Sequence, residues 1–226
     1  MTKTHFIYLH GFASSPRSEK AIFFANKLRN AGMDVTIPDL NEPTFLNLTL
    51  TRQLEHLAAI ADEHANEQLV LFGSSMGGLV ATLSTQRLSN VVGLVLLAPG
   101  FGITTRWDQI PGRHELDEWK RNGWHDVFHY RWNSKVPLKY DFVEDANQYT
   151  TVDLKVEVPT LLFHGVHDEV IPVAESRAFA RDNAEFVEYC ELDSDHDLLN
   201  VLDPIWSATE QFLQSNGLSK ALAAHR

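Results

Sequence analysis

The chain has 226 residues, of which 44% are hydrophobic, and its formal net charge is −11 at pH 7. A chain of this length and composition can bury one substantial core, so we expect a single domain over residues 1–226. The excess of carboxylates argues against a nucleic-acid partner, because binding a phosphate backbone requires clustered Lys and Arg side chains.

The predicted elements alternate between strands and helices along the chain. Apolar runs predict strands at residues 6–9, 34–38, 69–72, 91–98, 160–165 and 184–190. Apolar residues at helical spacing predict helices that begin near residues 18, 54, 76, 174 and 203. Strands separated by helices are typical of a parallel sheet with right-handed crossovers. The expected fold class is therefore α/β, with a doubly wound, mostly parallel sheet.

The pattern Gly73-x-Ser75-x-Gly77 lies where a predicted strand runs into a predicted helix. A side chain at either glycine position would collide with neighbouring backbone in a sharp strand-to-helix turn. This context predicts a nucleophile elbow, with the Ser75 hydroxyl above the edge of the sheet. Taken alone, the pattern also fits an ordinary glycine-rich turn before a helix.

Two further residues follow Ser75 in the chain order Ser, Asp, His. Asp168 comes just after the strand predicted at 160–165, and His196 just after the last predicted strand. The carboxyl ends of parallel strands meet at one edge of a sheet, where catalytic residues of such folds gather. We therefore predict a serine hydrolase in which His196 takes the proton of Ser75 and Asp168 orients His196.

Several segments carry a family resemblance. The chain resembles the α/β-hydrolase superfamily over its whole length through Leu9-His10-Gly11-Phe12, the elbow at 73–77, His164-Gly165-x-x-Asp168-x-x-Ile171-Pro172 and His196. The block from Tyr8 to Ala21 is similar to the opening of small bacterial esterases of the YqiA/YcfP type. The resemblance implies hydrolysis of carboxylic esters or thioesters without a cofactor. It also implies that the chain begins at the third strand of the full family fold.

The tetrahedral oxyanion of such a reaction needs hydrogen-bond donors that are already in place. The candidates are the backbone N–H groups of Met76 and Phe12, the second because it follows the first strand, where the family places its other donor. We group His10 with the substrate-binding residues and expect its imidazole to brace this loop. The alternative for His10 is a packed polar residue without a role in binding.

The segment from about residue 101 to 153 breaks the alternating pattern and lies between two core strands. We expect a helical, aromatic-rich lid insertion there, because it holds four of the five tryptophans: Trp107, Trp119, Trp124 and Trp132. In one interpretation their faces line an apolar substrate pocket over Ser75. In the other they build a small core for the insertion itself. We expect a mixture, with at least one aromatic residue of the insertion in contact with substrate.

Four other carboxylates are candidates for the triad acid, namely Glu169, Asp193, Asp195 and Asp197. The last three lie on the loop of His196 itself, where local backbone geometry usually aims such side chains away from the imidazole. Asp168 is therefore preferred, and Asp197 is expected to cap the loop that enters the next helix.

Two histidine pairs have spacings that suit zinc, His164-x-x-His167 and His125-x-x-x-His129. Neither pair has a cysteine or a carboxylate at motif spacing that could serve as the third ligand, so we expect no metal.

The amino end shows no leader pattern, and the longest apolar run, at 91–99, is too short to cross a bilayer. Cys190 is the only cysteine, which excludes an internal disulfide. We therefore expect a cytoplasmic protein without a membrane span.

The expected activity is the hydrolysis of carboxylic esters with small to medium acyl chains. The alternatives are a thioesterase acting on acyl-CoA or acyl-protein through the same three residues, and a non-catalytic binding module on the same fold. The residues leave the physiological substrate and the oligomeric state undetermined.

Overall fold

The computed structural model describes residues 3–150 and 152–219. Its centre is a sheet of six parallel strands in the order β2-β1-β3-β4-β7-β8. The strands are β1 (Thr4–Leu9), β2 (Asp34–Thr36), β3 (Gln68–Ser74), β4 (Val91–Leu97), β7 (Thr160–Gly165) and β8 (Val187–Leu192). The expected α/β fold with a parallel sheet is thus confirmed.

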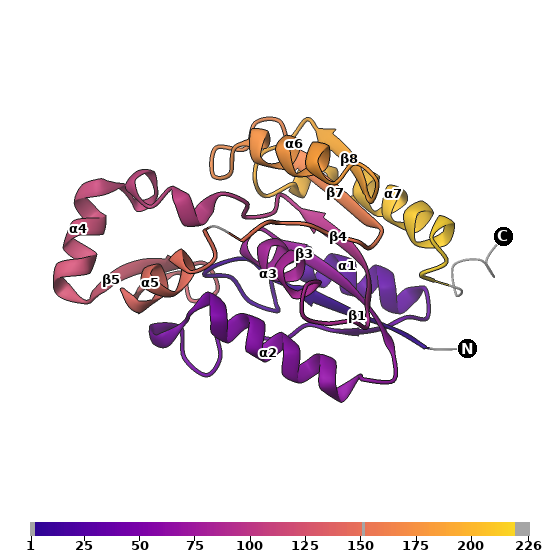
Figure 1. Ribbon diagram of the computed structural model, residues 1–226, viewed down its shortest axis with the longest axis horizontal. Helices are drawn as coiled ribbons and strands as arrows, with labels where there is room; N and C mark the ends of the chain where they lie inside the picture. The colour runs from indigo at the N-terminus through magenta and orange to yellow at the C-terminus, as the bar shows by residue number, and fades with distance from the viewer. Residues whose placement is uncertain (1–2, 151, 220–226) are drawn as a thin grey trace.

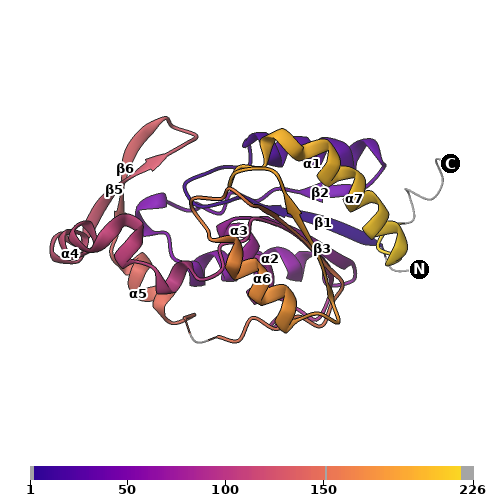
Figure 2. The ribbon, with the colours of Figure 1, turned by 90° about the horizontal axis from the view of Figure 1, so that it is seen from above.

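Helices cover both faces of this sheet, as Figure 2 shows. They are α1 (Glu19–Asn30) and α7 (Leu202–Ser215) on one face, and α2 (Leu50–Glu63), α3 (Met76–Ser84) and α6 (Val173–Asp182) on the other. Alternate strand residues point to opposite faces, so Leu71 of β3 packs with α2 and α3 while Phe72 packs with α1. Both faces of the strands are therefore apolar, as expected for a sheet buried on both sides.

Side-chain caps mark the starts of two helices. The Ser18 hydroxyl accepts a hydrogen bond from the N–H of Ala21 at the start of α1, and Thr49 caps α2 in the same way through the N–H of Arg52. Such caps satisfy backbone donors that have no partner inside the helix.

The last strand differs from its predicted bounds. It begins at Val187, because the preceding residues form a turn in which the N–H groups of Phe186 and Val187 both donate to the carbonyl of Asn183. The apolar character of Phe186 thus reflects packing against the core and not membership of the strand.

The insertion lies at one end of the molecule, on the side toward which the sheet strands run (Figure 1). It contains α4 (Arg113–Asn122), an antiparallel hairpin of β5 (Trp124–His129) and β6 (Ser134–Lys139), and α5 (Asp141–Asn147). The expectation of a helical insertion is therefore only partly correct. The hairpin begins because Gly123, with φ of 79°, ends α4 in a left-handed conformation. Figure 2 shows the hairpin projecting away from the sheet.

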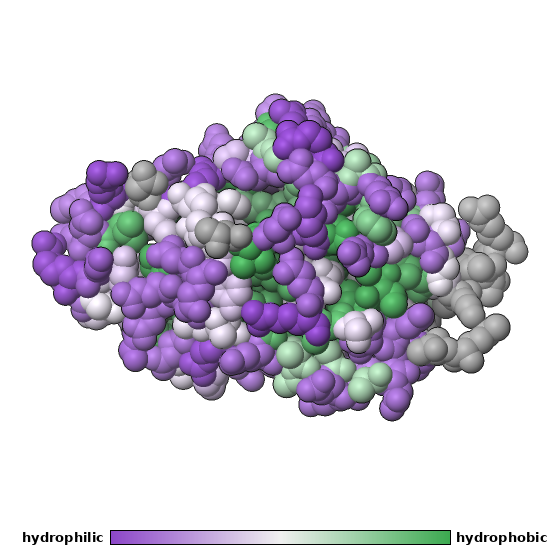
Figure 3. All heavy atoms as spheres, viewed as in Figure 1, coloured by the Kyte–Doolittle hydropathy of each residue, from purple (hydrophilic) through white to green (hydrophobic). Residues whose placement is uncertain are grey.

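Four short turns of helix complete the described chain. They are η1 (Phe45–Asn47), η2 (Ile103–Thr105), η3 (Asp108–Gly112) and η4 (Leu199–Val201). In Figure 3 hydrophilic side chains dominate the outer side of the insertion around α4, whereas hydrophobic ones gather in the middle of the face shown. Within residues 3–150 and 152–219, no helix has the length and apolar character needed to cross a membrane.

Candidate active site

Ser75 sits at a strained turn between β3 and α3, with φ of 52° and ψ of −119°. The backbone around it is held on both sides, because its N–H donates to the carbonyl of Leu97 and its carbonyl accepts from the N–H of Gly100. A Cβ added at Gly73 would lie 2.5 Å from the carbonyl oxygen of Gly77. Strain of this kind costs on the order of 1–3 kcal/mol and persists only where the surroundings impose it. The turn is the elbow geometry that the sequence predicts.

Three side chains from separate loops form one hydrogen-bonded chain at the carboxyl edge of the sheet. The Nε2 atom of His196 lies 3.0 Å from the Ser75 hydroxyl oxygen, and its Nδ1 atom lies 2.7 Å from Oδ2 of Asp168. Both separations are hydrogen-bond distances. The half-buried Ser75 and the His196 ring, which is 18% exposed, remain open on one side. The structure thus brings together the three residues singled out in the sequence.

The Asp168 carboxylate is buried and accepts hydrogen bonds at both oxygens. Oδ1 accepts from the backbone N–H groups of Val170 and Ile171, and Oδ2 lies 3.0 Å from Nε2 of His164 as well as near His196. Burial opposes the charge on this group. Donors from His164 and His196 outweigh that effect, so the pKa of Asp168 falls below its usual range. The carboxylate is therefore ionised at neutral pH.

His164 is a positioning residue that our reading of the sequence missed. Its Nδ1 atom lies 2.7 Å from the hydroxyl of Ser176 on α6, which leaves the Nε2 proton for Asp168 and the carbonyl of Ile171. The only sequence signal was the spacing of His164 and Asp168 within the acid loop. The role depends on Ser176, which is distant from that motif.

The competing carboxylates point elsewhere. Oδ1 of Asp195 accepts from the N–H groups of Asp197 and Leu198, so Asp195, and not Asp197 as expected, caps this loop. Asp193 lies 2.8 Å from His167 at the surface. Neither carboxylate is hydrogen-bonded to His196 within the described residues.

The loop after β1 lies directly against Ser75. A Cβ added at Gly11 would come within 3.3 Å of the Ser75 Cβ. Among the described residues, neither the N–H of Phe12 nor that of Met76 donates to another protein group. Both expected donors are thus free for a ligand, and Met76 adds the positive end of α3.

The buried imidazole of His10 holds the loop after β1 in place. Its ring is 1% exposed, Nδ1 lies 2.9 Å from the Gly11 carbonyl, and Nε2 accepts from the N–H of Leu40 at 3.0 Å. With both nitrogens engaged by backbone groups, the ring matches the expected brace. Direct contact of His10 with substrate stays a prediction that this packing does not favour.

Aromatic side chains connect this loop with the insertion. The Phe12 ring centroid lies 5.7 Å from that of Phe45 and 5.1 Å from that of Phe142, and Phe142 lies 5.8 Å from Trp107. These four rings form an apolar wall that begins at Phe12, the residue after Gly11, and Phe45, Phe142 and Trp107 are buried in it. Two of the four tryptophans contact these rings: Trp107 through Phe142, and Trp132 through Phe45, with ring centroids 6.3 Å apart.

Trp119, Trp124 and Trp132 differ in their surroundings. Trp119 is buried and donates its Nε1 proton to the carbonyl of Leu138, which fits a core within the insertion. Trp124 is 50% exposed on the hairpin. Trp132 stacks on His129 with ring centroids 3.8 Å apart. Substrate contact by these three stays a prediction.

The insertion is tied to both loops of the site by hydrogen bonds to backbone carbonyls. The N–H of Tyr130 donates to the carbonyl of Ala13, next to the Gly11 loop, over 3.0 Å. At the other end, the Arg106 guanidinium donates to the carbonyl of Val170 in the acid loop over 3.3 Å. The position of the insertion is thereby linked to the position of both loops.

The histidine pairs with zinc-like spacing do not converge on a third ligand. His164 is engaged with Asp168 and Ser176, while His167 turns to Asp193. His125 lies against the ring of Trp119. Within the described residues, the one group of three potential metal ligands is a different one, formed by His5, His64 and Glu67.

Known proteins with a related sequence or fold are hydrolases by name. A mitochondrial palmitoyl-protein thioesterase of rat, ABHD10, is 21% identical over 175 residues, which are 74% of this chain and 59% of that protein. The chain therefore spans less than two thirds of that relative.

Two solved structures share the fold. Est1E of Butyrivibrio proteoclasticus, with ferulic acid bound, has a TM-score of 0.80 at 19% identity, over 96% of this chain and 91% of its own. The mouse ABHD10 structure has a TM-score of 0.76 at 20% identity, over 97% and 92% of the two chains. The sheet and its covering helices are thus those of the α/β-hydrolase fold. Residues 5–213 match the profile described as "Uncharacterised protein family (UPF0227)", and the chain belongs to that family.

Proposed function

We propose that this protein is a serine hydrolase that cleaves carboxylic esters with small to medium acyl chains. The observation that carries the proposal is the continuous hydrogen-bonded chain from the Ser75 hydroxyl through His196 to Asp168, with separations of 3.0 and 2.7 Å. A binding module has no physical need for this arrangement on a strained turn.

In the proposed mechanism, neutral His196 accepts the Ser75 proton as Oγ attacks the substrate carbonyl carbon. The oxyanion that forms accepts hydrogen bonds from the N–H groups of Phe12 and Met76. His196 then passes its proton to the departing alkoxide, which leaves an ester on Ser75. A water molecule repeats the two steps, and Asp168 holds the imidazole in one tautomer throughout.

The proposed acyl site is the apolar wall of Phe12, Phe142 and Trp107, which begins at the residue after Gly11. A thioester is the second candidate substrate. Its tetrahedral intermediate would use the same oxyanion donors, and His196 can protonate the departing thiolate. The name of the ABHD10 relative, a palmitoyl-protein thioesterase, supports testing it. Cys190 is the only cysteine, so the fold contains no internal disulfide, which fits a cytoplasmic site of action.

The test uses a fluorophosphonate probe together with p-nitrophenyl esters and acyl-CoAs of graded chain length. The parent protein should be labelled and should hydrolyse at least one series, whereas Ser75→Ala should lose about four to six orders of magnitude in turnover and all labelling. Ser84→Ala is the matched control, because Ser84 is the last residue of α3, the helix that follows Ser75, and its hydroxyl donates to the carbonyl of Val80. Labelling that survives in Ser75→Ala would rule out the assignment.

A further inference from the structure

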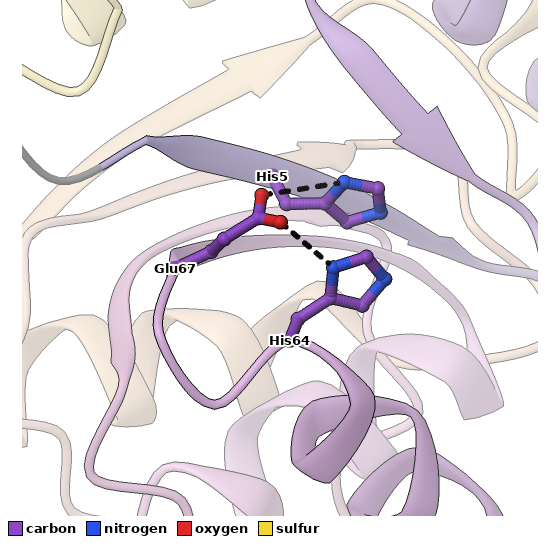
Figure 4. A group of neighbouring side chains, drawn as sticks. All are labelled: His5, His64 and Glu67. Atoms are coloured by element: carbon purple, nitrogen blue, oxygen red, sulfur yellow. Dashed lines mark hydrogen bonds and ion pairs between the residues drawn. The ribbon is translucent and has the colours of Figure 1, made fainter.

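Three potential metal ligands converge at the edge of the sheet opposite to Ser75 (Figure 4). His5 comes from the start of β1, His64 follows the last residue of α2, and Glu67 directly precedes β3. One ligand atom of each residue lies within 4.8 Å of the other two. The three segments are brought together by the pairing of β1 with β3.

The donor atoms face one another. Nδ1 of His64 lies 3.3 Å from Oε1 of Glu67, and Nδ1 of His5 lies 4.0 Å from Oε2 of Glu67. The two imidazoles are stacked with centroids 3.8 Å apart and planes inclined by 18°, so both Nδ1 atoms point toward the carboxylate, as Figure 4 shows.

Two of these atoms are buried without a hydrogen bond in the described part of the chain. They are Nδ1 of His5, a residue that is 6% exposed, and Oε2 of Glu67. Buried polar atoms nearly always have a hydrogen-bond partner, so two such atoms that face each other without one call for a ligand between them. The ion-pair contact of Oε2 with the Lys3 ammonium, at 3.6 Å, is longer than a hydrogen bond. The other nitrogen of His5 is already fixed, because Nε2 lies 2.8 Å from the Thr36 hydroxyl. Histidines that bind metals are commonly oriented by such a contact on the second ring nitrogen.

We propose that His5, His64 and Glu67 bind one divalent cation of the zinc class. Two imidazole nitrogens and one carboxylate are a ligand set that zinc uses with a water molecule in the fourth position. Zinc ligands at about 2.1 Å in tetrahedral geometry are about 3.4 Å apart. The pair of His64 and Glu67 is already near that separation. Because the two rings are stacked, at least one imidazole must turn when the ion binds, so that both Nδ1 lone pairs converge on it.

The bound cation would join the start of β1, the end of α2 and the start of β3. It would therefore stabilise the amino edge of the sheet and take no part in the reaction at Ser75. One competitor lies close by, since the Lys3 ammonium is 3.6 Å from Oε2 of Glu67 and 2.7 Å from Asp34. Lys3 supplies positive charge to this carboxylate when no metal is bound.

The test is a titration of chelator-treated full-length protein with Zn²⁺ by calorimetry, and with Co²⁺ by visible absorption. We expect one equivalent of Zn²⁺ to bind and an intense Co²⁺ spectrum typical of a tetrahedral site. Zn²⁺ at about a hundred times its Kd should raise Tm by about 5–10 °C. His64→Ala and Glu67→Gln should each weaken Zn²⁺ binding by about a hundredfold or more.

Two further variants make the test specific. Lys3→Ala should tighten Zn²⁺ binding, because it removes the competing ammonium and its side chain is largely exposed. His114→Ala should bind as the parent does, since His114 forms only a surface pair with Glu118. A Zn²⁺ affinity that is unchanged in both His64→Ala and Glu67→Gln, or a parent Kd above 1 mM, would overturn the proposal. Ester hydrolysis is not needed for any of these measurements, so their outcome is independent of the proposed function.

Discussion

The loops around Ser75 and the insertion at 101–153 are held in place by different kinds of contact. Ser75 is fixed by backbone hydrogen bonds and by close backbone approaches at Gly73, and the Asp168 carboxylate is hydrogen-bonded at both oxygens. The insertion combines aromatic packing with a few hydrogen bonds, among them those of Tyr130 to Ala13 and of Arg106 to Val170. Several of its large side chains are exposed on the hairpin, namely Trp124, Phe128, Tyr130 and Trp132.

This difference separates the chemistry from the choice of substrate. Reacting groups need geometry fixed to within a fraction of an ångström, whereas apolar packing tolerates changes of shape. Substitutions in the loops should therefore lower turnover for every substrate. Substitutions in the insertion should change stability or acyl-chain preference and leave the chemistry of short esters intact.

The largest expected effect tests the loop side of this comparison. Asp168→Asn should lower kcat by about 10⁴, because an amide no longer holds His196 in the tautomer that accepts the Ser75 proton. Steady-state kinetics on a short ester measure this. Asp195→Asn is the control and should lose far less, since the Asp195 carboxylate caps its own loop. Near-parent activity in Asp168→Asn would place the acid elsewhere.

A second prediction concerns the core of the insertion. Trp119→Ala should destabilise the protein by about 3–5 kcal/mol, because it empties a buried site and leaves the carbonyl of Leu138 without its donor. Trp124→Ala should change the free energy of unfolding by less than about 0.5 kcal/mol, because Trp124 is half exposed. Denaturant titration compares the two variants. Equal stabilities would mean that Trp119 does not support a core.

The third prediction addresses the apolar wall. Trp107→Ala should weaken octanoyl relative to acetyl esters by more than about 1 kcal/mol in kcat/KM, since it removes apolar contact area near the acyl chain at about 25 cal/mol per Å². The ratio of kcat/KM for the two esters is the measurement. Trp124→Ala is the matched control, because Trp124 is half exposed on the hairpin, whereas Trp132 packs on Phe45. An unchanged ratio in Trp107→Ala would assign this tryptophan to packing alone.

The smallest expected effect tests how the hairpin is attached. Arg131 forms an exposed ion pair with Asp39 at 3.1 Å, close to where the N–H of Tyr130 binds the Ala13 carbonyl. Arg131→Ala should cost less than about 1 kcal/mol of stability, and the difference should vanish at high salt because exposed pairs are screened. Hydrolysis rates should stay within about twofold of the parent. A tenfold lower hydrolysis rate would show that the ion pair, and not the hydrogen bond from Tyr130 to Ala13, positions the loop after β1.

Local motifs account for what the sequence could predict. The turn at Ser75 and the strands before Asp168 and His196 each lie within about ten residues, so glycine spacing and apolar runs were sufficient. The roles of His164 and of the cluster at His5 were missed, because each depends on a contact between distant segments, to Ser176 in one case and between His5 and His64 in the other. The hairpin was missed although residues 124–129 alternate in burial, since aromatic and charged residues there also fit a helical insertion.

The hydrogen bonds of Asp168 also determine which part of the site moves during a turnover. Two backbone N–H groups and His164 keep the carboxylate in place even if His196 leaves it. Within residues 3–150 and 152–219, the hydrogen bonds of the His196 ring run to Asp168 and to the Ser75 hydroxyl, and the ring is partly exposed. In the proposed mechanism the acid is therefore the stationary group. We expect the imidazole to be the part that moves between Ser75 and the leaving group.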